Sequence, residues 1–377
     1  MIKSLKITGY RGFKDLEMGH LGRVNLLVGK NNSGKTSALE AMSLLSSGYD
    51  PSALMRIVNR RGEIVFPEVQ QGQQLRQDID ISHLFHEHEL RSGTSFEIAT
   101  KAENSIPHKK VIYSIVDVNR DQIHPHYIAT HGMAGNALVG PYLGLKLETL
   151  EPSQPFSIIP LSKRLLRPED LQVLNNLRQG QKSPVNYQLV STESLLPMEL
   201  TAAWNSVVLT PEEDLVTKAL RYLEPRIERI AAVSPSLAPF FYQQGVSRSG
   251  FKVKLADVPD PLPVGTLGDG IWRMLALAIA ITRARDGVLL VDEIDTGLHY
   301  SIMADMWKLI SGSAKEFNIQ VFATTHSYDC IHSLASICTP DSRDEVTIQR
   351  LEVGKASTVP FSADEIVSAA KNYIEVR

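Results

Sequence analysis

The stretch Gly29-Lys30-Asn31-Asn32-Ser33-Gly34-Lys35-Thr36 decides the fold, because it fits the Walker A pattern G-x-x-x-x-G-K-[ST]. Before it, residues 23–28 are apolar enough for a buried strand, and after it residues 36–45 are good helix formers. In a strand–loop–helix unit, successive backbone N–H groups and the helix N-terminus surround a phosphate. The sequence therefore predicts a nucleoside triphosphate site. The alternative is a chance match in a glycine-rich turn.

Each residue of this loop has an expected role. Lys35 is expected to reach the β- and γ-phosphates, and the hydroxyl of Thr36 is expected to bind Mg²⁺. The other phosphate contacts are expected from Gly29, Asn31, Asn32, Ser33 and Gly34.

Composition places the chain among globular proteins with one large or two medium domains. It has 377 residues, 21% of them charged, and a formal net charge of −3. This balance disfavours a strongly basic nucleic-acid binder, although it leaves a local patch for DNA open. The two cysteines, Cys330 and Cys338, favour a reducing cytoplasm. Neither a signal peptide nor a membrane-length apolar run is apparent, so we expect a cytoplasmic protein without membrane contact.

A second motif ends a buried strand. Residues 287–291 are apolar and precede Asp292 and Glu293, which suits a central parallel strand that delivers carboxylates to the ligand edge of a sheet. Asp292 is then the Walker B aspartate, expected to hold Mg²⁺ through its water shell. Glu293 is placed to polarise a water for attack on the γ-phosphate. An ordinary strand end with solvated acids is the alternative.

A small turn before an apolar helix supplies the third element. Leu267-Gly268-Asp269-Gly270-Ile271-Trp272-Arg273 precedes an apolar run over residues 274–281, which predicts a buried helix with an anion-binding N-terminus. The turn resembles the signature motif LSxGxxR of ABC-type ATPases, with Gly268 in the place of the serine. A loop and helix without a ligand is the alternative. The resemblance implies nucleotide contacts from Leu267, Gly268, Asp269 and Gly270.

Two further segments complete the set. Ile294-Asp295-Thr296-Gly297-Leu298-His299 matches the D-loop of the same class, so Asp295 is expected near the nucleotide. Residues 319–325 form another predicted buried strand. His326 follows that strand directly, and this position implies the switch histidine that senses the γ-phosphate.

Together these motifs resemble the RecF/SMC/Rad50-like branch of ABC-type ATPases, and within it the stand-alone ATPases allied to OLD (overcoming lysogenisation defect) proteins. The opening residues 2–13 are similar to the first strand and arginine turn of that branch, which implies that Arg11 approaches the nucleotide phosphates. The Asn31-Asn32-Ser33 centre of the loop and a C-terminal helix ending in residues 373–377 are similar as well.

The chain also departs from members of this branch. Rad50 and SMC proteins carry a long coiled coil, whereas residues 101–254 show no sustained heptads. OLD nucleases continue into a Toprim domain, and only some fifty residues follow His326. We therefore expect no nuclease activity from this chain.

The resemblance implies an α/β fold, namely a P-loop ABC-type ATPase head with an antiparallel β lobe and an inserted short helical arm. We expect an N-terminal ATPase lobe over residues 1–135, the arm over residues 136–254, and a C-terminal ATPase lobe over residues 255–377. Short β-like runs at residues 95–100 and 110–118 fit the antiparallel lobe.

Local signals in the second half predict three more elements. Thr210-Pro211-Glu212-Glu213 predicts a helix through about Leu223. Residues 345–359 predict a hairpin, and the capping box Ser362-Ala363-Asp364-Glu365 opens a helix after it.

Several polar clusters have more than one interpretation. Candidates for the Q-loop residue are Gln70, Gln71, Gln73, Gln74 and the histidines at 83, 86 and 88. A solvated loop explains these histidines better than a zinc site, because no cysteine is near them. Asp78-Ile79-Asp80 has a metal-like spacing, but its alternation of polar and apolar residues predicts an exposed strand face.

The leading hypothesis is an ABC-type ATPase that binds and hydrolyses ATP with Mg²⁺. In this fold the signature turn cannot reach the Walker A loop of its own chain, so we expect a homodimer closed around two ATP molecules. A higher oligomer is the alternative. The resemblance implies control of a separate effector protein, a nuclease or toxin, in prokaryotic anti-phage defence. The alternatives are a RecF-like ATPase of DNA repair and recombination, and a nucleotide-binding scaffold with little turnover.

Overall fold

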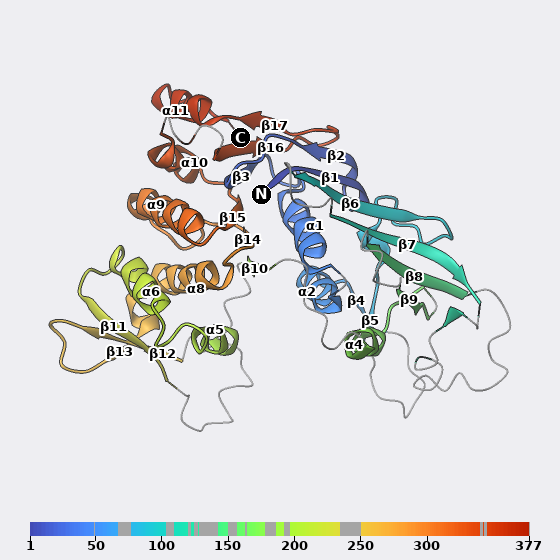
Figure 1. Ribbon diagram of the computed structural model, residues 1–377, viewed down its shortest axis with the longest axis horizontal. Coiled ribbons are helices and arrows are strands. Elements are labelled where there is room, and N and C mark those ends of the chain that lie inside the picture. The colour runs from blue at the N-terminus through green and yellow to red at the C-terminus, as the bar shows by residue number, and fades with distance from the viewer. Residues whose placement is uncertain are drawn as a thin grey trace. The chain divides into compact units, whose positions relative to one another are not determined.

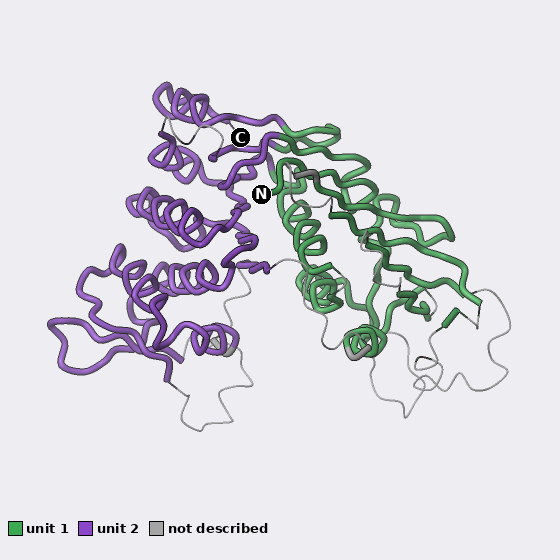
Figure 2. Tube along the Cα trace, in the orientation of Figure 1, with its two compact units in different colours: residues 1–19, 31–185, 351–358 green, residues 20–30, 186–350, 359–377 purple. Residues whose placement is uncertain are grey.

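Two six-stranded sheets organise the chain, one antiparallel and one largely parallel. The computed structural model describes residues 1–48, 50–66, 77–102, 109–119, 122–123, 127, 142–149, 157–162, 164–177, 186–191, 197–233, 250–339, 342 and 345–376. The chain divides into two compact units (Figure 2). Unit 1 comprises residues 1–19, 31–185 and 351–358, and unit 2 comprises residues 20–30, 186–350 and 359–377.

Unit 1 is built on the antiparallel sheet (Figure 1). An aromatic cluster anchors its core: the ring of Phe96 stacks on Tyr113 at 4.7 Å between centroids and contacts Tyr10 at 5.0 Å and Phe85 at 5.3 Å. The strands lie in the order β2 (Phe13–Met18), β1 (Ile2–Tyr10), β6 (Ser95–Ala102), β7 (Lys110–Val118), β8 (Tyr142–Thr149) and β9 (Ser157–Pro160).

Helices α1 (Lys35–Ser47), α2 (Pro51–Arg61) and α4 (Pro168–Leu177) belong to unit 1, and α1 packs on β1, β6 and β7. The ends of α2 follow from its sequence: Asp50 accepts a hydrogen bond from the backbone N of Ser52, Pro51 is the first helical residue, and Gly62 ends the helix at φ 67°. The short strands β4 (Ile64–Val65) and β5 (Asp78–Ile79) pair with each other, and the 3-10 helix η1 (Ser82–Leu84) comes next along the chain.

Unit 2 is built on the second sheet, whose central strands are buried along their whole length, as expected for parallel strands covered on both faces. Helices α8 (Asp269–Arg283), α9 (Tyr300–Glu316) and α10 (Tyr328–Leu334) lie along one face of it (Figure 1). The strands lie in the order β10 (Tyr187–Val190), β14 (Val288–Val291), β15 (Gln320–Thr324), β3 (Val24–Val28), β16 (Val346–Arg350) and β17 (Val359–Phe361); only β17 is antiparallel to its neighbour.

One buried amide fixes the centre of this sheet. Asn25 on β3 has no exposed surface, and its side-chain N donates to the carbonyl O of Val321 on β15 at 3.0 Å. Its Oδ1 accepts from the hydroxyl of Thr347 on β16 at 3.0 Å and from the backbone N of Gly22 at 2.8 Å. The amide thus joins β3 to both neighbours and fixes their register.

The remaining elements of unit 2 surround this sheet. Trp204 and Trp272 both contact the ring of Phe251 edge-on at 5.9 Å. Phe251 belongs to a separate three-stranded sheet, which these contacts join to α8. The elements are α5 (Pro197–Trp204), α6 (Glu212–Arg221), β11 (Ile227–Ala232), β12 (Phe251–Leu255), β13 (Leu262–Pro263), η3 (Val264–Leu267), η4 (Ala335–Ile337) and α11 (Ala363–Lys371).

Most predicted elements are confirmed. The strand, loop and helix around the Walker A motif are β3 and α1; the antiparallel runs are β6 and β7; the hairpin is β16 and β17; and the helix after Thr210 is α6. The capping box at Ser362 is present as well, although α11 ends at Lys371, before the expected end. The last residue, Arg377, lies outside the described residues.

The middle of the chain differs from the expected helical arm. Within residues 136–254, β8 and β9 extend the sheet of unit 1, β10 is an edge of the parallel sheet, and β11 pairs with β12. The expected limit at residue 136 falls inside unit 1, and the limit at 254 falls inside β12. The reason is that edge strands such as Tyr187–Val190 are short, so their apolar alternation is too brief to identify from sequence.

The prediction for the fold concerns the cap of α11. Ser362→Ala removes the hydroxyl that bonds Glu365 at 2.8 Å, and we expect a loss of about 1 kcal/mol of unfolding free energy in urea. The matched control is Ser368→Ala, an exposed serine of the same helix that caps nothing, which we expect to be neutral.

The same cap predicts a pH dependence. Hydrogen bonds from the backbone N and then the hydroxyl of Ser362 lower the pKa of Glu365 below its ordinary 4.5. A lowered folded-state pKa stabilises the fold above pH 4.5, and this contribution is lost as the pH falls through the lowered value. The Ser362→Ala deficit should therefore shrink in acid, and an equal deficit at pH 3 and 7 would contradict the cap.

Candidate nucleotide site

The Walker B and switch residues meet at one edge of the parallel sheet in unit 2. Strands β3, β15 and β14 are parallel neighbours, so their C-terminal ends lie at the same edge. Gly29 follows β3, Thr325 and His326 follow β15, and Asp292 and Glu293 follow β14. The structure therefore brings together the predicted start of the phosphate loop, the predicted metal-binding carboxylate, the predicted base and the predicted sensor.

A threonine that sequence analysis missed holds the two acidic residues. The Thr324 hydroxyl donates to Oδ1 of Asp292 at 2.6 Å and accepts from the backbone N of Glu293 at 2.8 Å. Asp292 is buried, with 2% of its surface exposed, and this bond directs its Oδ1. Glu293 itself has φ 48°, a left-handed conformation that is uncommon for a residue with a side chain.

The D-loop is tied to the same strand end. The hydroxyl of Thr325 donates to Oδ1 of Asp295 at 2.5 Å, and the hydroxyl of Thr296 donates to Oε2 of Glu293 at 3.2 Å. The carboxylate of Glu293 is partly accessible and His326 is exposed, so both can meet a ligand. The D-loop thus orients Glu293 without burying it.

Arg273 joins the signature helix to the Walker B strand. It is buried in α8, and its guanidinium donates to three carbonyl oxygens: Asp292 at 2.7 Å, Glu293 at 2.9 Å and Ser191 at 3.0 Å. The signature resemblance includes this arginine without explaining it. In the structure it is a positioning residue for the strand that carries the acids.

The signature turn has two glycines in different environments. Gly268 has φ 92° and is exposed, with nothing within 4 Å of where a Cβ would be, so it leaves open space above the N-terminus of α8. Asp269 is exposed beside it, while Leu267 is half-buried. A Cβ on Gly270 would instead lie 2.9 Å from Leu223 Cδ2 and 3.1 Å from the carbonyl O of Gly297. Gly270 thus lets the turn approach its own D-loop closely.

The second half of the Walker A loop lies in unit 1. Gly34 has φ 93°, and a Cβ there would collide with the ring of Phe13, so the loop and the Gly12-Phe13 turn pack directly together. Lys35 is buried, with Nζ 3.5 Å from the hydroxyl of Ser33. Thr36 is half-buried in the first turn of α1, and Asn31 and Asn32 are exposed.

Arg11 has carboxylate partners that the resemblance did not anticipate. Its Nε lies 2.9 Å from Oε2 of Glu40 on α1, and its Nη1 lies 2.5 Å from Oε1 of Glu63. Nε also donates to the Tyr10 hydroxyl at 3.2 Å, and burial raises the pKa of that hydroxyl far above its ordinary value, so it stays neutral. In this structure the guanidinium of Arg11 is engaged by side chains, and its contact with phosphate stays a prediction.

Two other expectations have mixed outcomes. Asp78 is buried, so the exposed face predicted for residues 78–80 is wrong at that position: β5 pairs with β4 and bridges to Leu166. The four Q-loop glutamines, Gln70, Gln71, Gln73 and Gln74, lie outside the described residues. Among the residues that the structure describes, no group of three or more His, Cys, Asp or Glu side chains is placed to hold a metal ion.

Two segments of the chain match known protein families. Residues 1–135 match the family described as "AAA ATPase domain", and residues 249–329 match "AAA domain, putative AbiEii toxin, Type IV TA system". Both segments that carry nucleotide motifs therefore resemble AAA ATPase domains. Across the described part of the chain, no helix combines the length and apolarity needed to cross a membrane.

Individual relatives are more distant. The chain is 20% identical over 361 residues to an ATP/GTP phosphatase of Helicobacter pylori, a match that covers 89% of this chain and 88% of that protein. A segment of 47 residues is 47% identical to the DNA replication and repair protein RecF of Clostridioides difficile, covering 12% of this chain and 13% of RecF. An SMC head crystallised with the C-terminal winged-helix domain of ScpA is 15% identical, with a TM-score of 0.48 over 96% of this chain and 98% of that one.

The site geometry predicts that Thr324→Val destabilises the protein. The change removes the hydrogen bond to a buried carboxylate and the acceptor for the Glu293 N–H, which should cost about 1–3 kcal/mol in urea unfolding. Thr324→Ser keeps the hydroxyl and serves as the control. Equal stabilities for the valine and serine variants would show that the hydroxyl does not hold the acidic residues.

Proposed function

We propose that the chain is an ABC-type ATPase that binds and hydrolyses ATP with Mg²⁺. The observation that carries this proposal is the shared edge of β3, β15 and β14, where Gly29, His326, Asp292 and Glu293 follow three adjacent parallel strands. The similarity to an ATP/GTP phosphatase, which covers 89% of this chain at 20% identity, supports it.

The residues fit the ligands by their chemistry. Gly29 at φ 144° and Gly34 at φ 93° give the loop a backbone that residues with side chains rarely adopt, and a loop of this kind can direct N–H groups toward a phosphate. Lys35 supplies the cation for the β- and γ-phosphates, and Asn31, Asn32 and Ser33 complete the loop. Thr36 and Asp292 are oxygen donors of the kind that Mg²⁺ prefers, and the metal would neutralise phosphate charge.

Hydrolysis is assigned to Glu293 and His326. Glu293 takes the proton of the attacking water as general base, in the orientation set by Thr324 and by the hydroxyl of Thr296. His326, exposed at the end of β15, contacts the γ-phosphate and reports its presence. Asp295 is held by Thr325, so it connects the sensor strand to the D-loop.

We also propose that two copies close around two ATP molecules. The exposed Gly268 and Asp269, with Leu267 and Gly270, would contact the nucleotide on the Walker A loop of the partner. Gly270 also contacts its own D-loop, because its missing side chain allows the close approach to Gly297. This coupling would let the D-loop respond to whatever the signature turn binds.

The output of such an ATPase would be the control of a separate effector, a nuclease or toxin, in anti-phage defence of the OLD type. The toxin–antitoxin description of the family matched by residues 249–329 supports this direction. The short match to RecF favours a second candidate, a DNA repair ATPase. A third candidate is a nucleotide-binding scaffold with little turnover, because Gly268 replaces the signature serine.

The catalytic assignment predicts opposite effects for two substitutions. Glu293→Gln should keep ATP binding and reduce turnover by roughly 10²-fold or more, the range expected for a lost general base. Lys35→Ala should weaken ATP binding itself. Both are measured by steady-state phosphate release and by ATP titration, with Glu316→Gln, a glutamate at the end of α9, as the control. Wild-type turnover in Glu293→Gln would remove this residue from the mechanism.

The sandwich predicts ATP-dependent association that Glu293→Gln traps, because hydrolysis is what releases it. Energy transfer between a label at Thr266 in one copy and a label at Lys30 in another should rise with ATP. Asp269→Trp should abolish this rise, because its ring fills the space expected for the nucleotide of the other copy, while ATP binding stays intact. Asp269→Asn is the matched control. If the energy transfer in Glu293→Gln does not change with ATP, the ATP-bound dimer is wrong and the scaffold with little turnover takes its place.

A further inference from the structure

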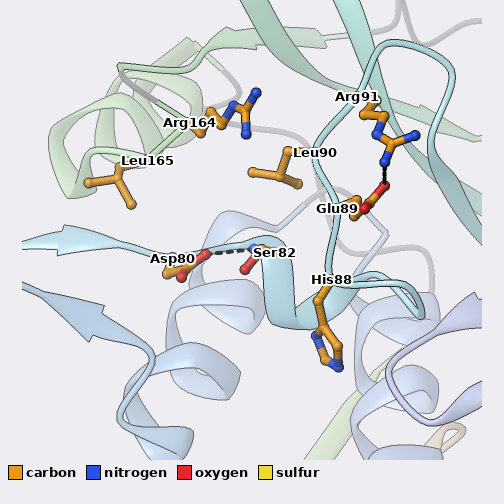
Figure 3. A pocket seen from close by; sticks show the side chains of 8 residues that line it. All are labelled: Asp80, Ser82, His88, Glu89, Leu90, Arg91, Arg164 and Leu165. Atoms are coloured by element: carbon orange, nitrogen blue, oxygen red, sulfur yellow. Dashed lines mark hydrogen bonds and ion pairs between the residues drawn. The ribbon is translucent and has the colours of Figure 1, made fainter.

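A pocket of about 390 Å³ lies in unit 1 (Figure 3). Its volume is in the range of small-molecule sites. No residue of the Walker A loop lines it. The lining residues are Asp80, Ser82, His88, Glu89, Leu90, Arg91, Arg164 and Leu165.

Backbone pairing holds two walls of this pocket together. Ile79, next to Asp80, exchanges backbone hydrogen bonds with Leu166 at 2.8 and 2.9 Å. Ser162 and Leu165 exchange two more at 2.9 Å and so close a tight turn that carries Arg164. The guanidinium of Arg167 donates to the Ser162 hydroxyl at 3.1 Å and braces the same turn. The pocket is therefore pre-formed by the fold.

Two lining residues have backbone conformations that usually belong to glycine. Arg164 has φ 68° and His88 has φ 56°. Residues other than glycine keep a positive φ only when the surrounding structure holds them in that conformation, and such residues are frequent at functional sites. Both belong to the wall of this one pocket.

The pocket lining carries charges of both signs. Arg91 is paired with Glu89, whereas Arg164 makes no hydrogen bond or ion pair with any residue that the structure describes. Across the pocket, Asp80 accepts from the backbone N of Ser82 at 2.9 Å and lies 3.7 Å from His83 Nε2. Figure 3 shows Arg164 and Arg91 on one side, with Glu89 beside Arg91, then Asp80 and His88 on the other side and Leu90 in between.

We propose that this pocket binds a nucleoside monophosphate. The phosphate would lie against Arg164 and Arg91, since guanidinium groups bind phosphate through paired N–H donors. The flat base would lie on Leu90 and Leu165, which are the apolar part of the lining. Asp80 would accept hydrogen bonds from the sugar hydroxyls or the base amino group. A bare phosphate would use only the arginine side, whereas a nucleoside monophosphate would also contact Asp80 and the two leucines.

The test titrates AMP into the full chain carrying Lys35→Ala, so that the Walker A loop does not compete. We expect saturable binding by calorimetry, weakened roughly tenfold or more by Arg164→Ala, as for a lost charge-assisted hydrogen bond. Arg164→Gly should weaken it equally while suiting the backbone at φ 68°, which separates ligand contact from misfolding. The matched control is Arg229→Ala, an exposed arginine on β11 of unit 2, and it should leave AMP affinity unchanged.

Further arms identify the two ends of the ligand. Asp80→Asn should weaken AMP and leave inorganic phosphate unaffected, and adenosine alone should bind more weakly than AMP. No AMP binding, equal AMP affinity in the Arg164 and Arg229 variants, or inorganic phosphate binding as tightly as AMP would each overturn the proposal. None of these measurements depends on ATP hydrolysis, so failure of the proposed ATPase activity would be seen separately.

Discussion

The buried amide of Asn25 is the interaction on which the arrangement of unit 2 depends. By bonding to Val321 on β15 and accepting from Thr347 on β16, it sets the register of β3 against both neighbours. A slip of one residue would leave this amide unsatisfied in a site with no exposed surface, which is costly. The same register aligns the C-terminal ends of β3 and β15, where Gly29 and His326 begin their loops. A polar residue in the core thus determines where the ligand edge lies.

From that edge, a series of contacts runs through unit 2 and returns to β15. Thr324 connects β15 to the acids of β14, and Arg273 connects those acids to α8 and hence to the signature turn. Gly270 at the start of α8 then touches the D-loop, whose Asp295 returns to Thr325 on β15. These contacts form a closed circuit within unit 2. A shift at the signature turn would move Asp292, Glu293 and His326 together. Each link is either a short hydrogen bond or the close contact at Gly270, where no side chain can move to absorb the shift.

The motifs were predictable because each one couples a local pattern to a chemical need. A glycine loop between strand and helix, or two acids after an apolar strand, can be identified without knowing the fold, and β3, α1 and β14 occur where expected. Thr324 was missed because a threonine at a strand end is common, and its role exists only when β15 lies beside β14. The four-residue edge strands β9 and β10 were missed for a similar reason. Short strands owe their conformation to partners far away in the sequence.

Arg11 shows where resemblance and packing give different answers. With Arg61, which bonds Glu40 at 2.8 Å, it forms a group of two arginines and two glutamates whose charges balance, and Arg11 and Glu40 are its buried members. Removing either partner from such a group would leave a buried charge without compensation. The turn around Arg11 is also held by backbone hydrogen bonds, from its own N to the carbonyl O of Leu84 and from the N of His86 to the carbonyl O of Gly9.

For Arg11 to reach a phosphate, the anion would have to replace Glu40 or Glu63 as the partner of its charge. A phosphate is the kind of ligand that can make this exchange, because it offers the same paired oxygen acceptors to a guanidinium as a carboxylate does. The two answers are thus compatible if Glu63 holds the arginine in the absence of nucleotide.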